Sequence, residues 1–194
     1  MNYFVLTVAS QDGAIIDSYP RGSPAEWKFD EGIHLAREFP ERAEVTFSRN
    51  FPDFRKLYDF QPNILGALII SAKARQLVDS LGVPHVEFLP VSIKDHRGNV
   101  VAGDYAILNL LGGEDAIEME RSDYKMNHIN KEQIGRIKKL ALKPEAISAE
   151  AKMFRCSRMR RLYLIREDVL AAFNEAGLTG FRTYPAEGWN GLEL

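Results

Sequence analysis

Residues 85–111 read HVEFLPVSIK, DHRGN and VVAGDYAILNLL, and this stretch decides the fold. Apolar side chains recur in its first segment at Val86, Phe88, Val91 and Ile93. Their alternation with polar partners is typical of a half-buried strand. The pair Gly98-Asn99 can take the positive backbone angles that reverse the chain. The stretch therefore predicts a β-hairpin with strands at residues 85–94 and 100–111.

Short apolar runs that end at turn residues lie on both sides of the hairpin. They predict strands at residues 3–8, 44–48, 66–70, 161–165 and 179–184. Two amphipathic stretches predict helices at residues 72–81, after a possible Ser71 cap, and at 166–176, before Gly177. Their core-facing positions are predicted to be Leu77, Val78, Leu81, Val169, Leu170 and Phe173.

These elements favour an α+β fold, mostly antiparallel sheet with a few flanking helices, over a doubly wound parallel sheet. The chain has 194 residues, a length at which one core remains efficient, so we expect a single domain over residues 1–194. Hydrophobic residues make up 45% and charged residues 27%, which excludes disordered and collagenous classes.

The cellular compartment is predicted from cysteine use and from the N-terminus. Cys156 is the single cysteine and cannot form an internal disulfide, which favours a reducing compartment such as the cytoplasm. The first eight residues lack the basic region of a signal peptide, and they resemble a first strand. No run approaches the roughly 18 apolar residues of a spanning helix, so no membrane association is expected.

Side chains that could carry chemistry are scattered along the sequence. The histidines His34, His85, His96 and His128 are widely separated, and none has the spacing of a metal site. Cys156 lies near Arg155 and Arg158, which would lower the pKa of its thiol, but no partner base is evident, and a structural cysteine is the preferred interpretation. Gly112-Gly113 is read as a turn. We expect no enzymatic activity, no cofactor and no metal.

Charge is segregated along the chain. The acidic segment, residues 114–123, contains Glu114, Asp115, Glu118, Glu120 and Asp123, with Arg121 as its only internal opposing charge. The basic segment, residues 125–166, contains twelve Lys or Arg against three acids. A basic face can bind nucleic acid phosphates, but the net charge is -2 and no aromatic residue interleaves residues 155–161. The preferred interpretation is a solvated face compensated by the acidic segment.

The order of these features resembles immunity protein family eleven of bacterial polymorphic toxin systems, whose founding domain is myxobacterial. The matching pieces are Ile69-Ile70-Ser71, Val86–Val91 with the Gly98 turn, Asp104-Tyr105, Leu108-Asn109, Asp115–Glu118, Glu120, Ser122, Met153–Arg155 and 177–181. The resemblance covers essentially the whole chain. One departure lies before the last helix, where Ile165-Arg166 replaces the serine-type cap of family members.

The resemblance implies a cytoplasmic antitoxin without enzymatic activity that binds the toxic domain of a cognate secreted effector and neutralises it. Charge-complementary surfaces speed such association, so the acidic segment is a candidate surface for a basic toxin. Equally, Asp115 and Glu118 could be features of the family because they pin the hairpin internally. The alternative hypothesis is a small-ligand or nucleic-acid-binding module that uses the basic segment, although specific binding of nucleic acid is not expected.

Overall fold

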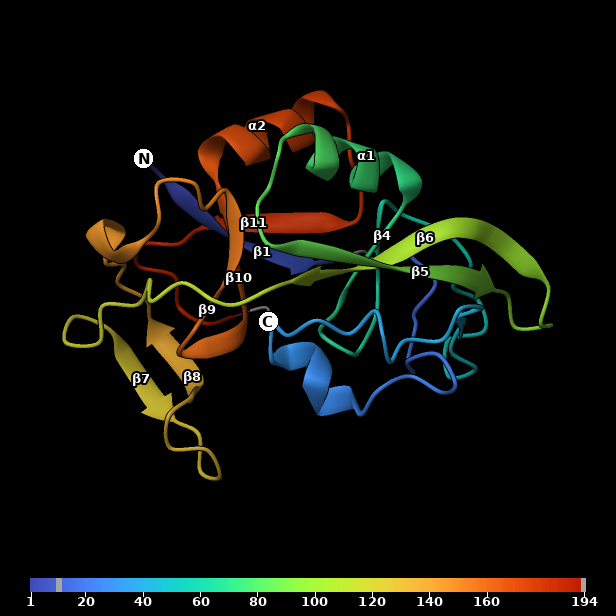
Figure 1. Cartoon of the computed structure of the whole chain (residues 1–194), viewed down its shortest axis with the longest axis horizontal. Helices are drawn as coiled ribbons and strands as arrows, with labels where there is room; N and C mark the ends of the chain where they lie inside the picture. The colour runs from blue at the N-terminus through green and yellow to red at the C-terminus, as the bar shows by residue number, and fades with distance from the viewer. Residues whose placement is uncertain (10–11, 193–194) are drawn as a thin grey trace.

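The computed structural model describes residues 1–9 and 12–192. Figure 1 shows its helices, α1 (Ala72–Ser80) and α2 (Glu167–Glu175), together with the short 3-10 helices η1 (Glu26–Asp30) and η2 (Pro144–Ala146). The strands are β1 (Tyr3–Val8), β2 (Glu44–Thr46), β3 (Phe60–Gln61), β4 (Leu68–Ile70), β5 (Val86–Lys94), β6 (Val100–Leu110), β7 (Asp123–Met126), β8 (Ile134–Lys139), β9 (Met153–Cys156), β10 (Met159–Arg166) and β11 (Phe181–Pro185). No helix in the described ranges has the length and apolarity needed to cross a membrane.

The strands form three sheets in which antiparallel pairing dominates. One sheet has the order β11-β1-β10-β9, the second has the order β2-β5-β6-β4-β3, and β7 and β8 form a two-stranded ribbon. β2 pairs with β5 in parallel, and the other ladders between these strands are antiparallel. The predicted mostly antiparallel arrangement is therefore confirmed, in a structure that contains more strand than the sequence indicated.

The β5–β6 hairpin is the predicted one. The side-chain Oδ1 of Asp95 accepts hydrogen bonds from the backbone N–H groups of Arg97 at 2.8 Å and Asn99 at 2.9 Å, which closes the turn. Gly98 takes a φ of 86° there, whereas Asn99 does not take a positive φ. His85, with a φ of 56°, precedes the first strand, which therefore begins one residue later than predicted.

Both predicted helices are present, and they lie side by side over the same side of the two larger sheets (Figure 1). Ser71 caps α1, because its Oγ accepts a hydrogen bond from the Ala74 amide at 3.2 Å. Arg166 precedes α2 and makes no side-chain cap. Val78, Val169 and Phe173 are buried beneath the helices, while Leu77, Leu81 and Leu170 are partly buried against the same core.

Four strands do not appear in the sequence prediction. They are β3, β7, β8 and β9. In β8 the buried residues Ile134 and Ile137 are three positions apart, because the register with β7 shifts twice. Such bulges remove the alternation by which a strand is found in a sequence. The last strand also begins later than predicted, at Phe181.

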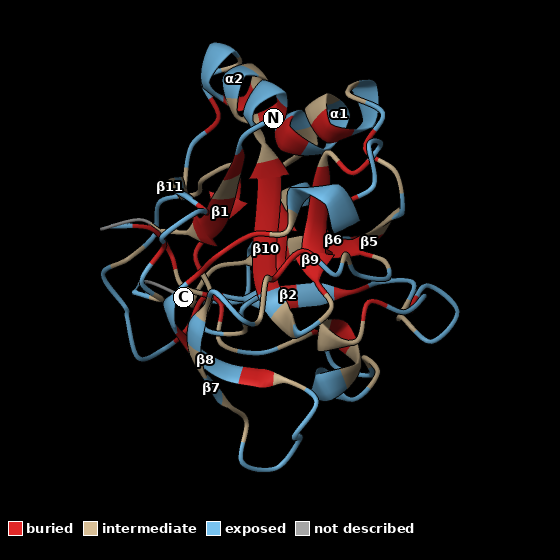
Figure 2. Ribbon diagram, turned by 90° about the vertical axis from the view of Figure 1, so that its left-hand side faces the viewer, coloured by how far each residue is buried: buried red, intermediate tan, exposed pale blue. Residues whose placement is uncertain are grey.

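The described residues form three buried apolar clusters, which Figure 2 shows as the red interior of β1, β10 and β6. The cluster beneath α1 and α2 combines side chains of both larger sheets, such as Leu6 and Ile165 of one and Leu68 and Leu108 of the other. The β7–β8 ribbon packs instead on the opposite side of the four-stranded sheet, together with Val5 and Leu162. The four-stranded sheet is therefore covered on both faces.

A buried arginine joins the larger sheets to η1. Arg155 of β9 is only 2% exposed. Its Nε donates to the Leu110 carbonyl of β6 at 2.7 Å, and its Nη2 donates to Asn109 Oδ1 at 3.3 Å. Its Nη1 lies 3.1 Å from the carbonyl oxygens of both Asp30 and Arg160. This one side chain therefore holds β9, β6, β10 and η1 together.

A chain of hydrogen bonds continues from this arginine across β6 to β5. The Nδ2 of Asn109 donates to Glu87 Oε2 at 3.0 Å and to the Ile33 carbonyl at 2.8 Å. The Glu87 carboxylate accepts the backbone N–H groups of Leu35 and Ala36 at 2.9 and 3.1 Å. Burial raises the pKa of Glu87, but these hydrogen bonds outweigh it and hold that pKa below the ordinary value.

The backbones of Gly32 and Gly112 approach each other closely near these hydrogen bonds. The amide of Gly112 donates to the Gly32 carbonyl at 2.7 Å, just beyond the end of β6. Gly32 has a φ of 65°, and a Cβ atom placed on it would lie 2.5 Å from the Gly112 carbonyl oxygen. Only glycine satisfies both requirements at position 32.

We expect Arg155→Ala to lower the free energy of unfolding by at least about 3 kcal/mol, since each buried polar group left without a partner costs about 1–3 kcal/mol. Arg155→Lys keeps the charge but lacks the forked donors, so it should recover only part of this loss. Arg161→Ala is the control, because that side chain is 62% exposed and its ion pair should contribute under about 1 kcal/mol. Urea denaturation measures all three, and equal losses for the two alanine variants would contradict the assignment.

A second stability prediction compares two glycines that both have positive φ. Gly112 has a φ of 69° and open space where a Cβ would lie, so Gly112→Ala should cost only the conformational penalty of about 1–2 kcal/mol. Gly32→Ala should cost more, because the added methyl also overlaps the Gly112 carbonyl. Thermal unfolding followed by circular dichroism should give the lower Tm for Gly32→Ala, and the reverse order would refute the close-approach argument.

Candidate functional site

The acidic segment begins as an extension of the four-stranded sheet. The backbone of Glu114 forms a parallel bridge beside Cys156, accepting from the Ser157 amide at 2.9 Å and donating to the Arg155 carbonyl at 3.0 Å. Its carboxylate accepts the Ser148 amide at 3.0 Å. Glu114 is therefore half-buried and already engaged within the chain.

Two further acids of this segment form ion pairs with lysines of the basic segment. Asp115 lies 2.8 Å from Lys143 Nζ, and this hydrogen bond raises the pKa of the lysine. Asp123 lies 3.7 Å from Lys138 Nζ. Arg121 is the only opposing charge within the segment, but in the folded chain Lys138 and Lys143, which follow later in the sequence, also oppose its acids. Arg121 itself lies 3.8 Å from Glu187.

The structure describes no ion pair for Glu114, Glu118 or Glu120, and among the described contacts of these three carboxylates only that of Glu114 reaches a residue outside the segment. Glu118 donates its backbone amide to the Ala141 carbonyl at 2.9 Å, and its carboxylate lies 3.4 Å from the Glu120 amide. Glu120 is exposed. The half-buried Glu118 and the exposed Glu120 therefore lie at one turn, whose backbone is hydrogen-bonded to Ala141.

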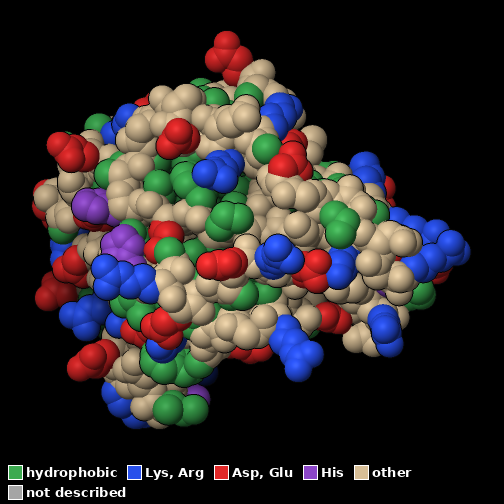
Figure 3. All heavy atoms as spheres, turned by 45° about the vertical axis from the view of Figure 1, so that its right-hand side comes forward, with side chains coloured by type: hydrophobic (Ala, Val, Ile, Leu, Met, Phe, Trp, Pro, Cys, Tyr) green, Lys and Arg blue, Asp and Glu red, His purple; other side chains and the backbone are tan. Residues whose placement is uncertain are grey.

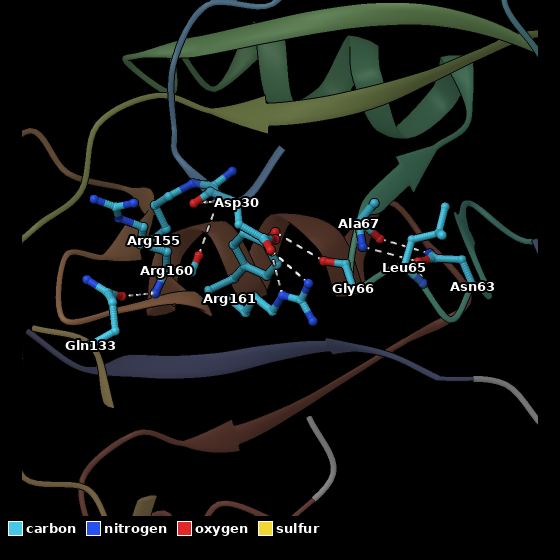
Figure 4. Close-up of polar contacts among 10 residues, drawn as sticks. Asp30, Asn63, Leu65, Gly66, Ala67, Gln133, Arg155, Arg160 and Arg161 are labelled. Atoms are coloured by element: carbon cyan, nitrogen blue, oxygen red, sulfur yellow. Dashed lines mark hydrogen bonds and ion pairs between the residues drawn. The ribbon is translucent and has the colours of Figure 1, made fainter. Parts of the chain in front are cut away.

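The arginines of the basic segment are mostly engaged within the molecule. Figure 4 shows Arg161 reaching toward Asp30, with an Nη2–Oδ2 distance of 2.7 Å, and Arg155 beside the same loop. Arg160 forms an ion pair with Glu31. Arg166 pairs with Asp168 at 2.6 Å. Three of the four arginines at residues 155–161 therefore contact other parts of the molecule, whereas Arg158 is exposed and no side-chain contact is described for it.

An apolar cleft of about 360 Å³ lies beside Arg161, between the end of β1 and residues 63–68. Its lining includes Leu6, Ile64 and Tyr163, and the charged residue among its described lining residues is Arg161. Since that guanidinium is paired with Asp30, the cleft offers little to fix a charged ligand. The space-filling view in Figure 3 likewise shows acidic and basic side chains interspersed over the face that it presents.

The histidines and the cysteine do not converge. His34 lies 3.3 Å from Glu87, and His96 lies 3.0 Å from the Ser48 carbonyl. His128 is exposed at the end of the β7–β8 ribbon. Over residues 1–9 and 12–192, no group of three His, Cys, Asp or Glu side chains could hold a metal ion.

Cys156 is fully buried, and burial raises the pKa of its thiol, as do the nearby carboxylates of Asp115 and Glu114. The pKa of this thiol is thus raised and not lowered, contrary to what the neighbouring Arg155 and Arg158 suggested in the sequence, and the burial agrees with a structural cysteine.

Sequence reasoning missed the residues that position this region, namely Arg155, Asn109 and Glu87. A signal was present, because Asn109 stands within the apolar run AILNLL and Glu87 within VEFLPV. A polar residue inside a buried strand needs hydrogen-bond partners, and that requirement predicts a network even though the partners cannot be identified from sequence.

The burial of Cys156 predicts a thiol that is protected in the folded protein. In native buffer at pH 8, Cys156 should react with a chromogenic disulfide reagent orders of magnitude more slowly than a free cysteine, because only the exposed thiolate attacks. After denaturation in guanidinium one thiol per chain should react at once. Rapid modification of the native protein, with unchanged circular dichroism, would contradict the buried position.

Comparison with known families agrees with this organisation. The model of the immunity protein family Imm11 matches residues 7–188, which include the hairpin, the acidic segment and the basic segment. No curated protein matches the chain. The match covers far more than half of the 194 residues and confirms the resemblance noted in the sequence. The chain belongs to the Imm11 immunity protein family.

Proposed function

We propose that this chain is an antitoxin that binds the toxic domain of a cognate effector in the cytoplasm and neutralises it without catalysis of its own. The observation that carries the proposal is the family match over residues 7–188. Neutralisation by binding needs a rigid surface more than reactive groups, since preorganised surfaces lose little entropy on association. The internal hydrogen bonds of the acidic segment provide such rigidity.

We propose the acidic segment as a toxin-binding surface, with distinct roles for its five acids. Glu118 and Glu120 would make the direct contacts, since no contact of their carboxylates with a residue outside the segment is described. Glu114, Asp115 and Asp123 would fix the shape of the segment through Ser148, Lys143 and Lys138. The partner surface would then be basic, and attraction between the two would speed association.

The alternative of a nucleic-acid-binding module has less support. Its sequence argument was the basic segment at residues 125–166. Within that segment Arg155, Arg160 and Arg161 contact Asp30, Glu31 and backbone carbonyls. Exposed cations without a described ion pair, such as Lys125 and Arg136, remain in the segment. Its aromatic residues, Phe154 and Tyr163, are buried and therefore offer no surface on which a base could stack. We therefore expect no sequence-specific binding of nucleic acid at physiological salt, where non-specific electrostatic affinity is about 10⁻⁴ to 10⁻⁶ M.

The test combines Glu118→Lys with Glu120→Lys and measures binding to the purified, catalytically inactivated toxin encoded beside this chain. We expect slower association, by about tenfold at low ionic strength, and a difference that shrinks as salt rises, because exposed charges steer encounter and are screened. Protection of cells that express the toxin should weaken in parallel. The parent chain itself should bind the toxin and restore growth.

The matched control is the pair Glu41→Lys and Glu175→Lys, which makes the same change in net charge at exposed positions outside the segment. This control should associate nearly as fast as the parent. If both double variants lose the same amount, net charge rather than the acidic segment governs binding. If the parent neither binds nor protects, the antitoxin role itself is refuted.

A further inference from the structure

The β7–β8 ribbon with its connecting loop, residues 123–139, forms an arm that projects from the body of the molecule (Figures 1 and 2). Its base is anchored, because Ile134 and Ile137 are buried and Tyr124 and Met126 pack against the same core cluster. Its far end, residues 127–133, extends beyond that core. The proposed antitoxin role above assigns no task to this arm.

An apolar side chain stands at the end of the arm. Ile129 is 97% exposed, the highest value among the described large hydrophobic residues. The loop that carries it is ordered by hydrogen bonds, since Asn127 Oδ1 accepts the amides of Ile129 and Asn130 at 2.8 and 3.1 Å. Gln133 ties the same loop to the body, with its Nε2 2.8 Å from the Ser157 carbonyl. Ile129 is therefore held outward on a fixed support.

Cations cover the outer face of the arm. Lys125 and Arg136 are directly opposed across the ribbon, and both are exposed. Like charges in opposed positions destabilise a strand pair, so this arrangement costs folding free energy. Of the arm's basic residues, Lys138 has a described carboxylate partner, Asp123, whereas no described ion pair involves Lys125, Arg136 or Lys139. An anionic partner would relieve the repulsion.

We infer that the β7–β8 arm is a second toxin-contacting surface, on which Ile129 enters an apolar recess of the toxin and Lys125 and Arg136 face acidic side chains around that recess. The inference rests on the proposed antitoxin function and adds a second contact to it. Apolar anchors at the centre of a contact supply most of its binding free energy, and the surrounding charges set partner choice and association rate.

A protein partner suits the arm better than a lipid surface or a nucleic acid. One isoleucine buries too little apolar area for stable membrane anchoring, for which even a single long acyl chain is marginal. Single-stranded nucleic acid binding uses exposed aromatic platforms, whereas the arm's aromatic residue, Tyr124, packs into the core. A narrow, rigid end with one apolar side chain matches a recess in a folded partner.

The experiment measures binding kinetics between the full chain and the inactivated cognate toxin for two arm variants. Ile129→Ser should weaken binding by about tenfold or more, mainly through faster dissociation, as expected for loss of an anchor. Lys125→Glu combined with Arg136→Glu should slow association severalfold at low salt, and much less at high salt. Both variants should keep the Tm of the parent to within a few degrees.

Two matched controls separate the arm from general surface effects. Ile64→Ser removes another exposed isoleucine, 68% exposed and outside the arm. Arg37→Glu with Arg42→Glu makes the same change in net charge at exposed positions before β2. Both controls should bind the toxin as the parent does, and both should protect cells equally well.

The outcomes distinguish this inference from the function on which it rests. If the parent chain binds the toxin and both arm variants bind it equally well, the arm inference is overturned and the antitoxin function stands. If the parent does not bind, both fall. The inference is also overturned if the arm variants keep toxin affinity but lose binding to phosphatidylserine vesicles or to duplex DNA, since the arm would then serve a lipid or a nucleic acid.

Discussion

The interior guanidinium of Arg155 is the constraint on which the rest of the structure depends. A cation in a protein interior is costly unless its donors are all occupied, and here carbonyl and amide oxygens rather than a carboxylate occupy them. The ring of Tyr163, 5.3 Å from the guanidinium carbon, adds a favourable cation–π contact. Because these groups come from β6, β10 and η1, the guanidinium fixes how the two larger sheets meet.

The same strand that carries this arginine also determines where the acidic segment begins. The Arg155 carbonyl accepts the Glu114 amide, so the segment is attached to β9 directly beside the inter-sheet junction. The segment then continues into β7 and the arm, with Ala141 and Lys143 holding its middle. The acidic segment and the arm are therefore attached to the hydrogen-bonded junction of the two larger sheets and are not independent loops.

Local sequence signals were sufficient for part of this structure. The turn at Asp95 and Gly98, the Ser71 cap and the apolar stripes of both helices depend on neighbours within a few positions, and all are present. The ribbon of β7 and β8 was missed, because bulges break its alternation. Other features depend on contacts between residues that are far apart in the sequence, for which a single sequence contains no direct signal. Examples are the pairing of Asp115 with Lys143, 28 positions later, and the burial of Arg155. The composition of the sequence identified the acidic residues of the segment, but it did not indicate which of them form ion pairs within the chain.

The topology of the four-stranded sheet has a consequence for synthesis in the cell. β1 lies between β10 and β11, so residues 3–8 find their partners only in residues 159–185. A ribosome adds about 5–20 residues per second, and contacts of such long sequence separation form late and slowly. β1 therefore remains without its partner strands until β10 and β11 have been synthesised. A nascent or prematurely ended chain lacks this sheet, so the complete fold, and any activity that depends on it, is reached only after residues 159–185 have been synthesised.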